Sequence, residues 1–273
     1  MKKLHFDYSM ELNYSEQVQK CHFTIKCIPQ TTDRQKIEDL NVELEPRDSM
    51  EESVDSFGNR FLFGNVMEEH DRFVFRIRGT AYTGLADSEP LGDENILGAY
   101  RYPYGLTVPG KGLTEYFNSL SLQKERTAYE TGVYLMRRLY EDFSYEKNVT
   151  DMNTTAEEAW QLGRGVCQDY AHILIVLCRM AGIPARYVAG MLIGEGYSHA
   201  WVEVLSDNRW YALDPTNNCV VTDSHIRIGI GRDASDCLIN RGVMTGGGRQ
   251  SQDIRVVVRE LPQEANKEVK KYG

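Results

Sequence analysis

A bend with two glycines leads into a long apolar run in Gly163-Arg164-Gly165-Val166-Cys167-Gln168-Asp169-Tyr170-Ala171-His172, which continues as Ile173-Leu174-Ile175-Val176-Leu177-Cys178. This pattern predicts a helix from about Val166 to Ala181, because Gly182 fits a C-terminal cap and Pro184 prevents continuation. The helix is apolar on nearly every side, so we expect it to be buried at the centre of its domain.

Cys167 stands at the beginning of this helix. The first backbone N–H groups of a helix have no partner within it and present the positive end of the helix dipole. A thiol placed there has its thiolate form favoured, which is the usual setting of a nucleophilic cysteine. The alternative is that Cys167 is one small buried hydrophobic residue among six cysteines.

The bulk composition is that of an ordinary globular protein, with 273 residues, 41% hydrophobic and 26% charged. A net charge of −9 without a basic block argues against nucleic acid or an anionic membrane as a partner. The first residues lack the apolar segment of a signal peptide, and the run 173–178 is too short to cross a bilayer. We therefore expect a cytoplasmic protein whose cysteines are reduced thiols.

The first third of the chain alternates between apolar and polar residues, as half-buried strands do. Such alternation is found in residues 6–14, 21–27 and 73–77. Helical spacing begins only later, in 126–143 and in a capped segment that starts at 154–155. The pattern predicts an α+β protein with an N-terminal antiparallel β-sandwich in residues 1–105, a Gly- and Pro-rich connection, and a second domain in residues 110–273. In that second domain we expect a buried helix packed on an antiparallel sheet, with further strands toward the C-terminus.

Two short strands joined by Asp207-Asn208 bring two polar residues together. If these two residues form the turn, Ser206 pairs with Arg209. His199 and Asp214 then become diagonal neighbours on one face of the hairpin, about 7–8 Å apart at Cα and within reach of each other's side chains. A register shifted by one residue would place them on opposite faces.

His199 shares its strand face with Trp201 and Glu203, since all three are at alternate positions. A face that combines polar groups with tryptophan favours a cleft wall over a second core. His172 lies on the central helix, and we expect it to serve packing or a hydrogen bond to a loop. Cysteine and histidine are the ligand types of zinc, but no CxxC or HxxxH spacing accompanies them, so neither a metal nor a cofactor is expected.

Four motifs in this order resemble the bacterial transglutaminase-like superfamily. They are Gly163 to His172, Gly182-Ile-Pro-Ala-Arg-Tyr-Val-Ala-Gly190, Ser198-His199-Ala-Trp-Val-Glu and Leu213-Asp214-Pro-Thr-Asn217. The strand-rich first third is similar to the domain that often precedes that core. The resemblance implies a papain-like catalytic triad, carried onto Cys167, His199 and Asp214, and acyl transfer through a thioester.

This chemistry implies a protein or peptide substrate, whose amide carbonyl the Cys167 thiolate attacks. The donors to the oxyanion are expected to be the Cys167 backbone N–H and a side chain of Gln161 or Trp160, although both side chains also suit ordinary packing or exposure. We expect a cysteine-dependent amide hydrolase or acyltransferase, with protease-like activity slightly favoured. The alternatives are an amine-accepting transglutaminase and a module that binds a partner without catalysis.

Overall fold

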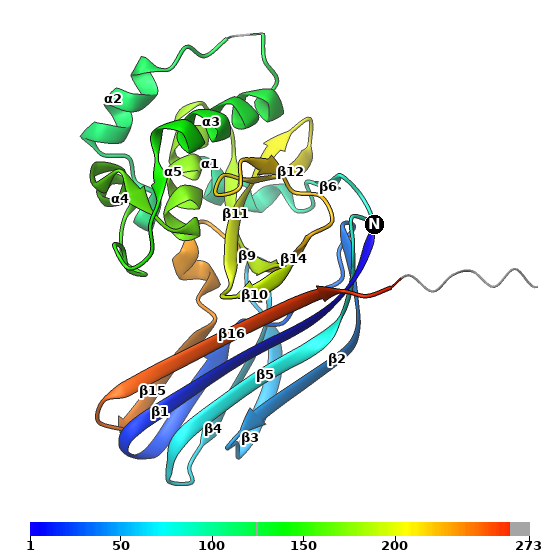
Figure 1. The fold of residues 1–273 in the computed structure, drawn as a ribbon, viewed down its shortest axis with the longest axis vertical. Coiled ribbons are helices and arrows are strands. Elements are labelled where there is room, and N and C mark those ends of the chain that lie inside the picture. Colours follow the sequence, from blue (N-terminus) through cyan, green and yellow to red (C-terminus); the bar gives the residue numbers. More distant parts are fainter. Residues whose placement is uncertain (124, 263–273) are drawn as a thin grey trace, which may run out of the picture.

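The computed structural model describes residues 1–123 and 125–262. Two antiparallel sheets follow each other along the long axis of the molecule, and the helices gather at the end away from the first sheet (Figure 1). The first sheet has eight strands and the second has six. The architecture is therefore rich in curled antiparallel sheet, with its α-helices confined to one part of the chain.

The first sheet is organised by one long strand, β1, to which most of the other strands pair. The first half of β1 pairs with β5 and β16, and its second half pairs with β4 and β15 after a shift between Asn13 and Val18. The strands of this sheet are β1 (Lys2–Ile25), β2 (Gln35–Glu45), β3 (Ser49–Val54), β4 (Arg60–Val66), β5 (His70–Thr83), β10 (Gly194–Gly196), β15 (Asn240–Gly246) and β16 (Gln250–Glu260). Because β1 belongs to both halves, the strands form one curled sheet around a shared core.

The alternation predicted for this region is confirmed, because the apolar positions of β1 and β5 point into that core. The C-terminal strands differ from the prediction. The sequence places the C-terminal strands in the second domain, but β15 and β16 both pair with β1, and β10 pairs with β16. The chain thus returns to the first sheet after the second is complete. No local turn in the sequence indicates that these strands pair with β1.

The second sheet carries the helices. Its strands are β6 (Ser88–Pro90), β9 (Ala185–Leu192), β11 (His199–Ser206), β12 (Arg209–Asp214), β13 (Cys219–Val220) and β14 (His225–Gly231), and the short β7 (Ser144–Tyr145) and β8 (Arg164–Gly165) pair separately. The α-helices are α1 (Leu97–Arg101), α2 (Lys111–Ser119), α3 (Ala128–Asp142), α4 (Ala156–Leu162) and α5 (Cys167–Met180). Three 3-10 turns, η1 (Glu94–Ile96), η2 (Gly105–Thr107) and η3 (Ala234–Cys237), complete the elements.

The predicted central helix is confirmed as α5, which contacts β9, β11, α3 and α4. Every residue from Asp169 to Arg179 is buried. The predicted cap of α4 is also confirmed, since the Thr155 side chain accepts from the Glu158 backbone N–H and the Glu158 side chain accepts from the Thr155 backbone N–H. His172 lies inside the core as expected, where its Nε2 accepts a hydrogen bond from the backbone of Ala234 at 3.1 Å.

A buried cluster of charges ties the connecting segments to the second sheet. Glu203 accepts from Arg186 at 2.6 Å, and Glu89 accepts from Arg227 at 2.6 Å. Arg34, from the segment that precedes β2, lies 3.9 Å from Glu203. The cluster therefore places three guanidinium groups around two carboxylates, on the sheet face opposite α5.

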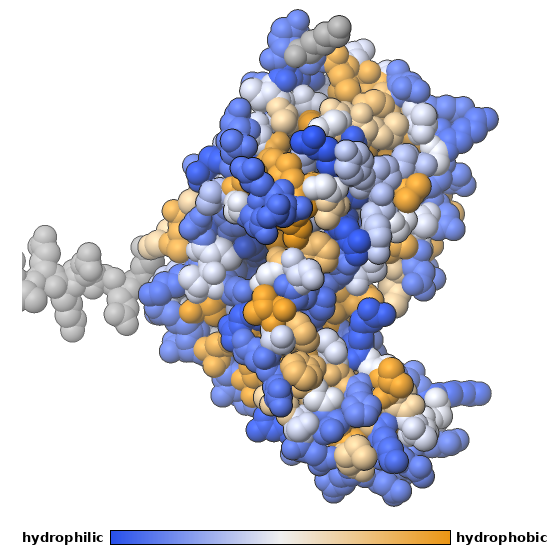
Figure 2. All heavy atoms as spheres, turned by 180° about the vertical axis from the view of Figure 1, so that it is seen from behind, coloured by the Kyte–Doolittle hydropathy of each residue, from blue (hydrophilic) through white to orange (hydrophobic). Residues whose placement is uncertain are grey.

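The surface is mixed in character. Figure 2 shows hydrophilic residues spread over both lobes of the molecule, between smaller groups of hydrophobic ones. Among the described residues, no helix has the length and apolar character needed to cross a membrane. All six cysteines are free, and only Cys167 and Cys219 are partly exposed.

Candidate active site

The turn before α5 fixes the position of Cys167. The buried carboxylate of Asp169 accepts hydrogen bonds from the backbone N–H of Val166 and from the Thr150 hydroxyl, both at 2.7 Å. Gly165 is required here, because a Cβ at that position would lie 2.4 Å from the Asp169 Oδ2 atom. Asp169 therefore holds the chain in the bend that sets Cys167 at the first position of the helix.

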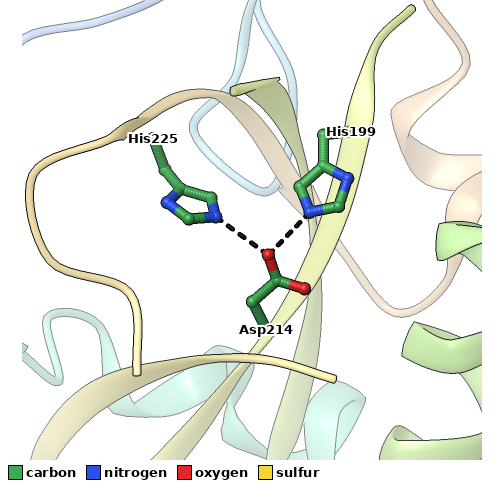
Figure 3. A group of neighbouring side chains, drawn as sticks. All are labelled: His199, Asp214 and His225. Atoms are coloured by element: carbon green, nitrogen blue, oxygen red, sulfur yellow. Dashed lines mark hydrogen bonds and ion pairs between the residues drawn. The ribbon is translucent and has the colours of Figure 1, made fainter. Parts of the chain in front are cut away.

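The hairpin has the predicted register. Ser206 pairs with Arg209, and Val202 pairs with Leu213. Asp207 and Asn208 have φ values of 51° and 58°, the left-handed conformation that a two-residue turn of this type requires at both positions. Figure 3 shows the outcome, in which His199 Nε2 lies 2.7 Å from Asp214 Oδ2.

His199 is held with one ring nitrogen on Asp214, and the other points away from that carboxylate (Figure 3). Burial disfavours the charged ring. Hydrogen bonding and charge attraction to Asp214 and Cys167 outweigh that effect and raise the pKa of His199 to about 10. The imidazole is therefore protonated at neutral pH, between a carboxylate on one side and the sulfur on the other.

Asp214 is fully buried yet richly hydrogen-bonded. Its Oδ1 accepts from the backbone N–H groups of Thr216 and Asn217, and its Oδ2 accepts from the Asn217 amide at 2.7 Å as well as from His199. Burial alone would raise the pKa of this carboxyl. The hydrogen bonds from His199, His225 and Asn217 instead hold the pKa far below its usual range.

His225 is a site residue that sequence reasoning missed. Its Nε2 lies 3.0 Å from the same Asp214 Oδ2 that contacts His199 (Figure 3). The sequence around it is merely polar, and its strand, β14, pairs with β9, more than thirty residues earlier. No local turn fixes that pairing, so the sequence offered no signal for this contact.

Cys167 and His199 line one pocket of about 370 Å³. Tyr145, Lys147 and Asn217 also line it, together with the exposed segment Gly194–Tyr197. The pocket therefore lies where the second sheet meets β10, at the junction with the first sheet.

The prediction that Trp201 and Glu203 form a cleft wall is wrong. Trp201 and Glu203 are each 2% exposed and do not line the pocket. Trp201 packs with Val188 and Ala212 in a small core of its own, while Glu203 belongs to the buried charge cluster. This face of the strand is covered by segments distant in sequence, which its alternating pattern could not reveal.

The two predicted side-chain oxyanion donors are also absent from the pocket. The Gln161 amide donates to Glu157 at 3.0 Å and lines a separate hollow on α4. Trp160 packs against Tyr116 in a tilted arrangement, with ring centroids 4.2 Å apart. Neither side chain lines the pocket that contains Cys167 and His199.

Three ligand atoms of His199, Asp214 and His225 lie within 4.8 Å of one another, close enough to share a metal ion. The hydrogen bonds between them show how these atoms are used. Both imidazole Nε2 atoms point at one carboxylate oxygen, at 2.7 and 3.0 Å. A cation bound by these atoms would have to replace both Nε2 protons, and it would take His199 away from the thiol. The arrangement therefore fits two imidazole N–H groups that donate to one carboxylate better than it fits a metal site.

Two family models match the chain in the regions that the fold sets apart. Residues 117–215, which contain α3, α4, α5 and the hairpin, match the transglutaminase-like superfamily. Residues 4–81 match the bacterial transglutaminase-like N-terminal region. The second match covers nearly all of the chain from β1 to β5.

The chain also resembles mycobacterial proteins over part of its length. The chain is 35% identical over 127 residues to the uncharacterized protein ML0607 of Mycobacterium leprae, a match that covers 43% of this chain and 45% of that protein. It is also 35% identical over 126 residues to the uncharacterized protein Rv2569c of Mycobacterium tuberculosis, covering 40% of each. The matches thus span less than half the length of these relatives.

A solved structure shares the whole fold. The crystal structure of a candidate cysteine protease from Cytophaga hutchinsonii superimposes with a TM-score of 0.77 and 21% identity, over 97% of this chain and 92% of that one. At that identity the likeness concerns the fold alone. The matches therefore identify residues 117–215 as a transglutaminase-like core and residues 4–81 as the bacterial transglutaminase-like N-terminal region that precedes it.

Proposed function

We propose that the protein is a cysteine-dependent enzyme that cleaves or transfers peptide-like acyl groups through a thioester on Cys167. The observation that carries the proposal is the position of His199, which lines the same pocket as Cys167 and is held through Nε2 by the buried Asp214. A thiol, a base and an acceptor that orients the base are the parts that nucleophilic amide chemistry needs. The superfamily match and the likeness to a candidate cysteine protease support the same chemistry.

The proposed reaction begins from a Cys167 thiolate beside a protonated His199. The sulfur attacks the carbonyl carbon of an amide, and the C–N bond breaks as His199 gives its Nδ1 proton to the departing amine. Water then attacks the thioester, His199 takes a proton from it, and the carboxylic acid leaves as the C–S bond breaks. Throughout the reaction the Nε2 proton stays on His199, where it is donated to the Asp214 carboxylate. This hydrogen bond keeps Nδ1 facing the sulfur.

The Cys167 backbone N–H is the proposed donor to the oxyanion, because it belongs to the N-terminus of α5. That position puts a positive dipole end beside the carbonyl oxygen when the sulfur attacks. The Trp160 and Gln161 side chains have no part in this proposal.

We favour hydrolysis over transfer to an amine because the pocket is open to water. The segment Gly194–Tyr197, which forms one side of the pocket, is exposed, and the Tyr145 and Tyr197 side chains are 50% and 67% exposed. A thioester formed there would meet water at high concentration, whereas transamidation needs water kept out. Amine transfer is the alternative, and one assay separates the two.

The assay incubates the protein with a library of glutamine-containing peptides and a primary amine and follows the peptide masses. Hydrolysis of a main-chain amide splits a peptide into two products whose masses sum to that of the peptide plus water. Deamidation and amine incorporation instead change the mass of an intact peptide by different amounts. We expect chain cleavage, and protein first alkylated with iodoacetamide is the control that should show none. Products that appear equally with the alkylated protein, or no product from any peptide, would overturn the proposal.

A further inference from the structure

Asp214 Oδ2 accepts hydrogen bonds from two histidines, which lie on opposite sides of it (Figure 3). His199 Nε2 lies 2.7 Å from this oxygen and His225 Nε2 lies 3.0 Å from it, while the two rings are 5.7 Å apart at their centroids. His225 does not line the pocket that contains Cys167. Any effect of His225 on the sulfur must therefore pass through Asp214 and His199.

The hydrogen bonds of His225 identify its protonated nitrogen. Asp214 carries no proton at neutral pH, so the bond between the two groups requires a proton on His225 Nε2. The Ser224 hydroxyl lies 3.3 Å from the other nitrogen, Nδ1, and suits it as a donor. The Trp201 ring stands edge-on against the imidazole, with centroids 5.1 Å apart, and restricts its rotation.

The surroundings also keep this imidazole neutral. His225 is 6% exposed, and burial is the main cause that lowers its pKa. Asp214 favours the charged form, but the neighbouring charges of His199 and Arg34 oppose it. The remaining charged groups that share its surroundings are Arg227, Glu203 and Glu89. They belong to the buried cluster, in which Glu89 pairs with Arg227 and Glu203 pairs with Arg186.

We propose that His225 is a positioning residue, which holds Asp214 by a neutral Nε2–H donor so that the same oxygen stays aimed at His199. The inference rests on the proposed function, since positioning matters only if Cys167 and His199 react. A neutral donor is suited to this task, because it fixes the carboxylate without cancelling the negative charge that stabilises the His199 imidazolium. Without His225, the side chains in the described part of the chain that donate to Asp214 are those of His199 and Asn217.

Two variants separate the hydrogen bond from the packing of the ring. His225→Gln places an amide N–H near the position of the imidazole Nε2–H, and His225→Phe keeps a ring but removes the donor. The readout is the rate at which iodoacetamide alkylates Cys167 at pH 7, followed by mass spectrometry of its peptide. We expect the Gln variant to react within about threefold of the wild type and the Phe variant about tenfold or more slowly, as suits a lost hydrogen bond to a charged group.

A second measurement needs no substitution and covers the case in which His225→Phe does not fold. In ¹⁵N-labelled wild-type protein at pH 7, imidazole NMR should show His225 neutral with its proton on Nε2, and His199 protonated on both nitrogens. A charged His225, or a proton on its Nδ1, would overturn the inference.

The outcomes also distinguish this inference from the proposed function. Fast alkylation of Cys167 in the wild type, with the same rate in both variants or the same loss in both, would overturn only the positioning role. Equal alkylation of Cys167 and the other partly exposed thiol, Cys219, in the wild type would overturn the proposed function and this role together.

Discussion

Replacing Cys167 by serine is expected to lower turnover in the peptide assay by at least about ten-thousand-fold, the scale on which triad nucleophiles act. The hydroxyl has nearly the shape of the thiol but a far higher pKa, so His199 cannot hold it ionised. Cys167 is only partly buried, and the free energy of unfolding should change by no more than about 1 kcal/mol.

The loss of turnover would therefore come from the chemistry and not from a weakened fold. Denaturant unfolding of the wild type and the Cys167→Ser protein checks this by comparing their free energies of unfolding. Wild-type turnover in the Cys167→Ser protein, or a fall of only about tenfold, would show that the sulfur does not form the thioester. A variant that fails to fold would be replaced by Cys167→Ala, for which the same loss is expected.

The second large effect is expected at Glu203, in the buried charge cluster. Burial raises the pKa of this carboxyl, but Arg186, Arg227 and Arg34 outweigh burial and lower it to about 2, from an ordinary value of 4.5. Glu203→Gln removes the charge that faces these guanidinium groups and leaves Glu89 as the only other carboxylate of the cluster. We expect the free energy of unfolding to fall by about 3–5 kcal/mol, the usual cost of breaking a buried ion pair.

The pH dependence of that loss has a definite sign. Because the folded pKa of Glu203 is lowered, its charge stabilises the fold above about pH 4.5, and this stabilisation disappears as the pH falls from 4.5 toward 2. The difference between wild type and Glu203→Gln should shrink over the same range. Glu52→Gln is the matched control, since Glu52 pairs with Arg60 at the surface and should cost less than about 1 kcal/mol. If Glu203→Gln and Glu52→Gln lower the free energy of unfolding equally, the buried ion pairs of Glu203 do not stabilise the fold more than a surface pair does.

The parts of the site that depend on local geometry could be predicted from the sequence. The helix that begins at Cys167 follows from its apolar run and its glycines, and the contact between His199 and Asp214 follows from one two-residue turn. In each case a few consecutive residues determine the backbone, so the prediction needs no knowledge of distant partners.

The parts that were missed depend on pairing between distant segments. His225 reaches Asp214 because β14 pairs with β9, and the C-terminal strands join the first sheet because β1 is long enough to pair with both. The strand pattern predicts a cleft position for Glu203, because it shows which residues share a face of the strand but not what covers that face. Arg34, from far earlier in the chain, lies against it.

The alkylation rate of each thiol in the intact wild-type protein at pH 6 shows whether Cys167 is an activated nucleophile. Cys219 is the internal reference, because it is also partly exposed and its burial raises its pKa. If His199 and the helix end hold Cys167 as a thiolate, iodoacetamide should label Cys167 at least about tenfold faster than Cys219 at this pH, where an ordinary thiol is almost entirely protonated. If Cys167 is labelled no faster than Cys219, and its labelling rate rises only as the pH approaches the pKa of a free thiol, Cys167 is not an activated nucleophile.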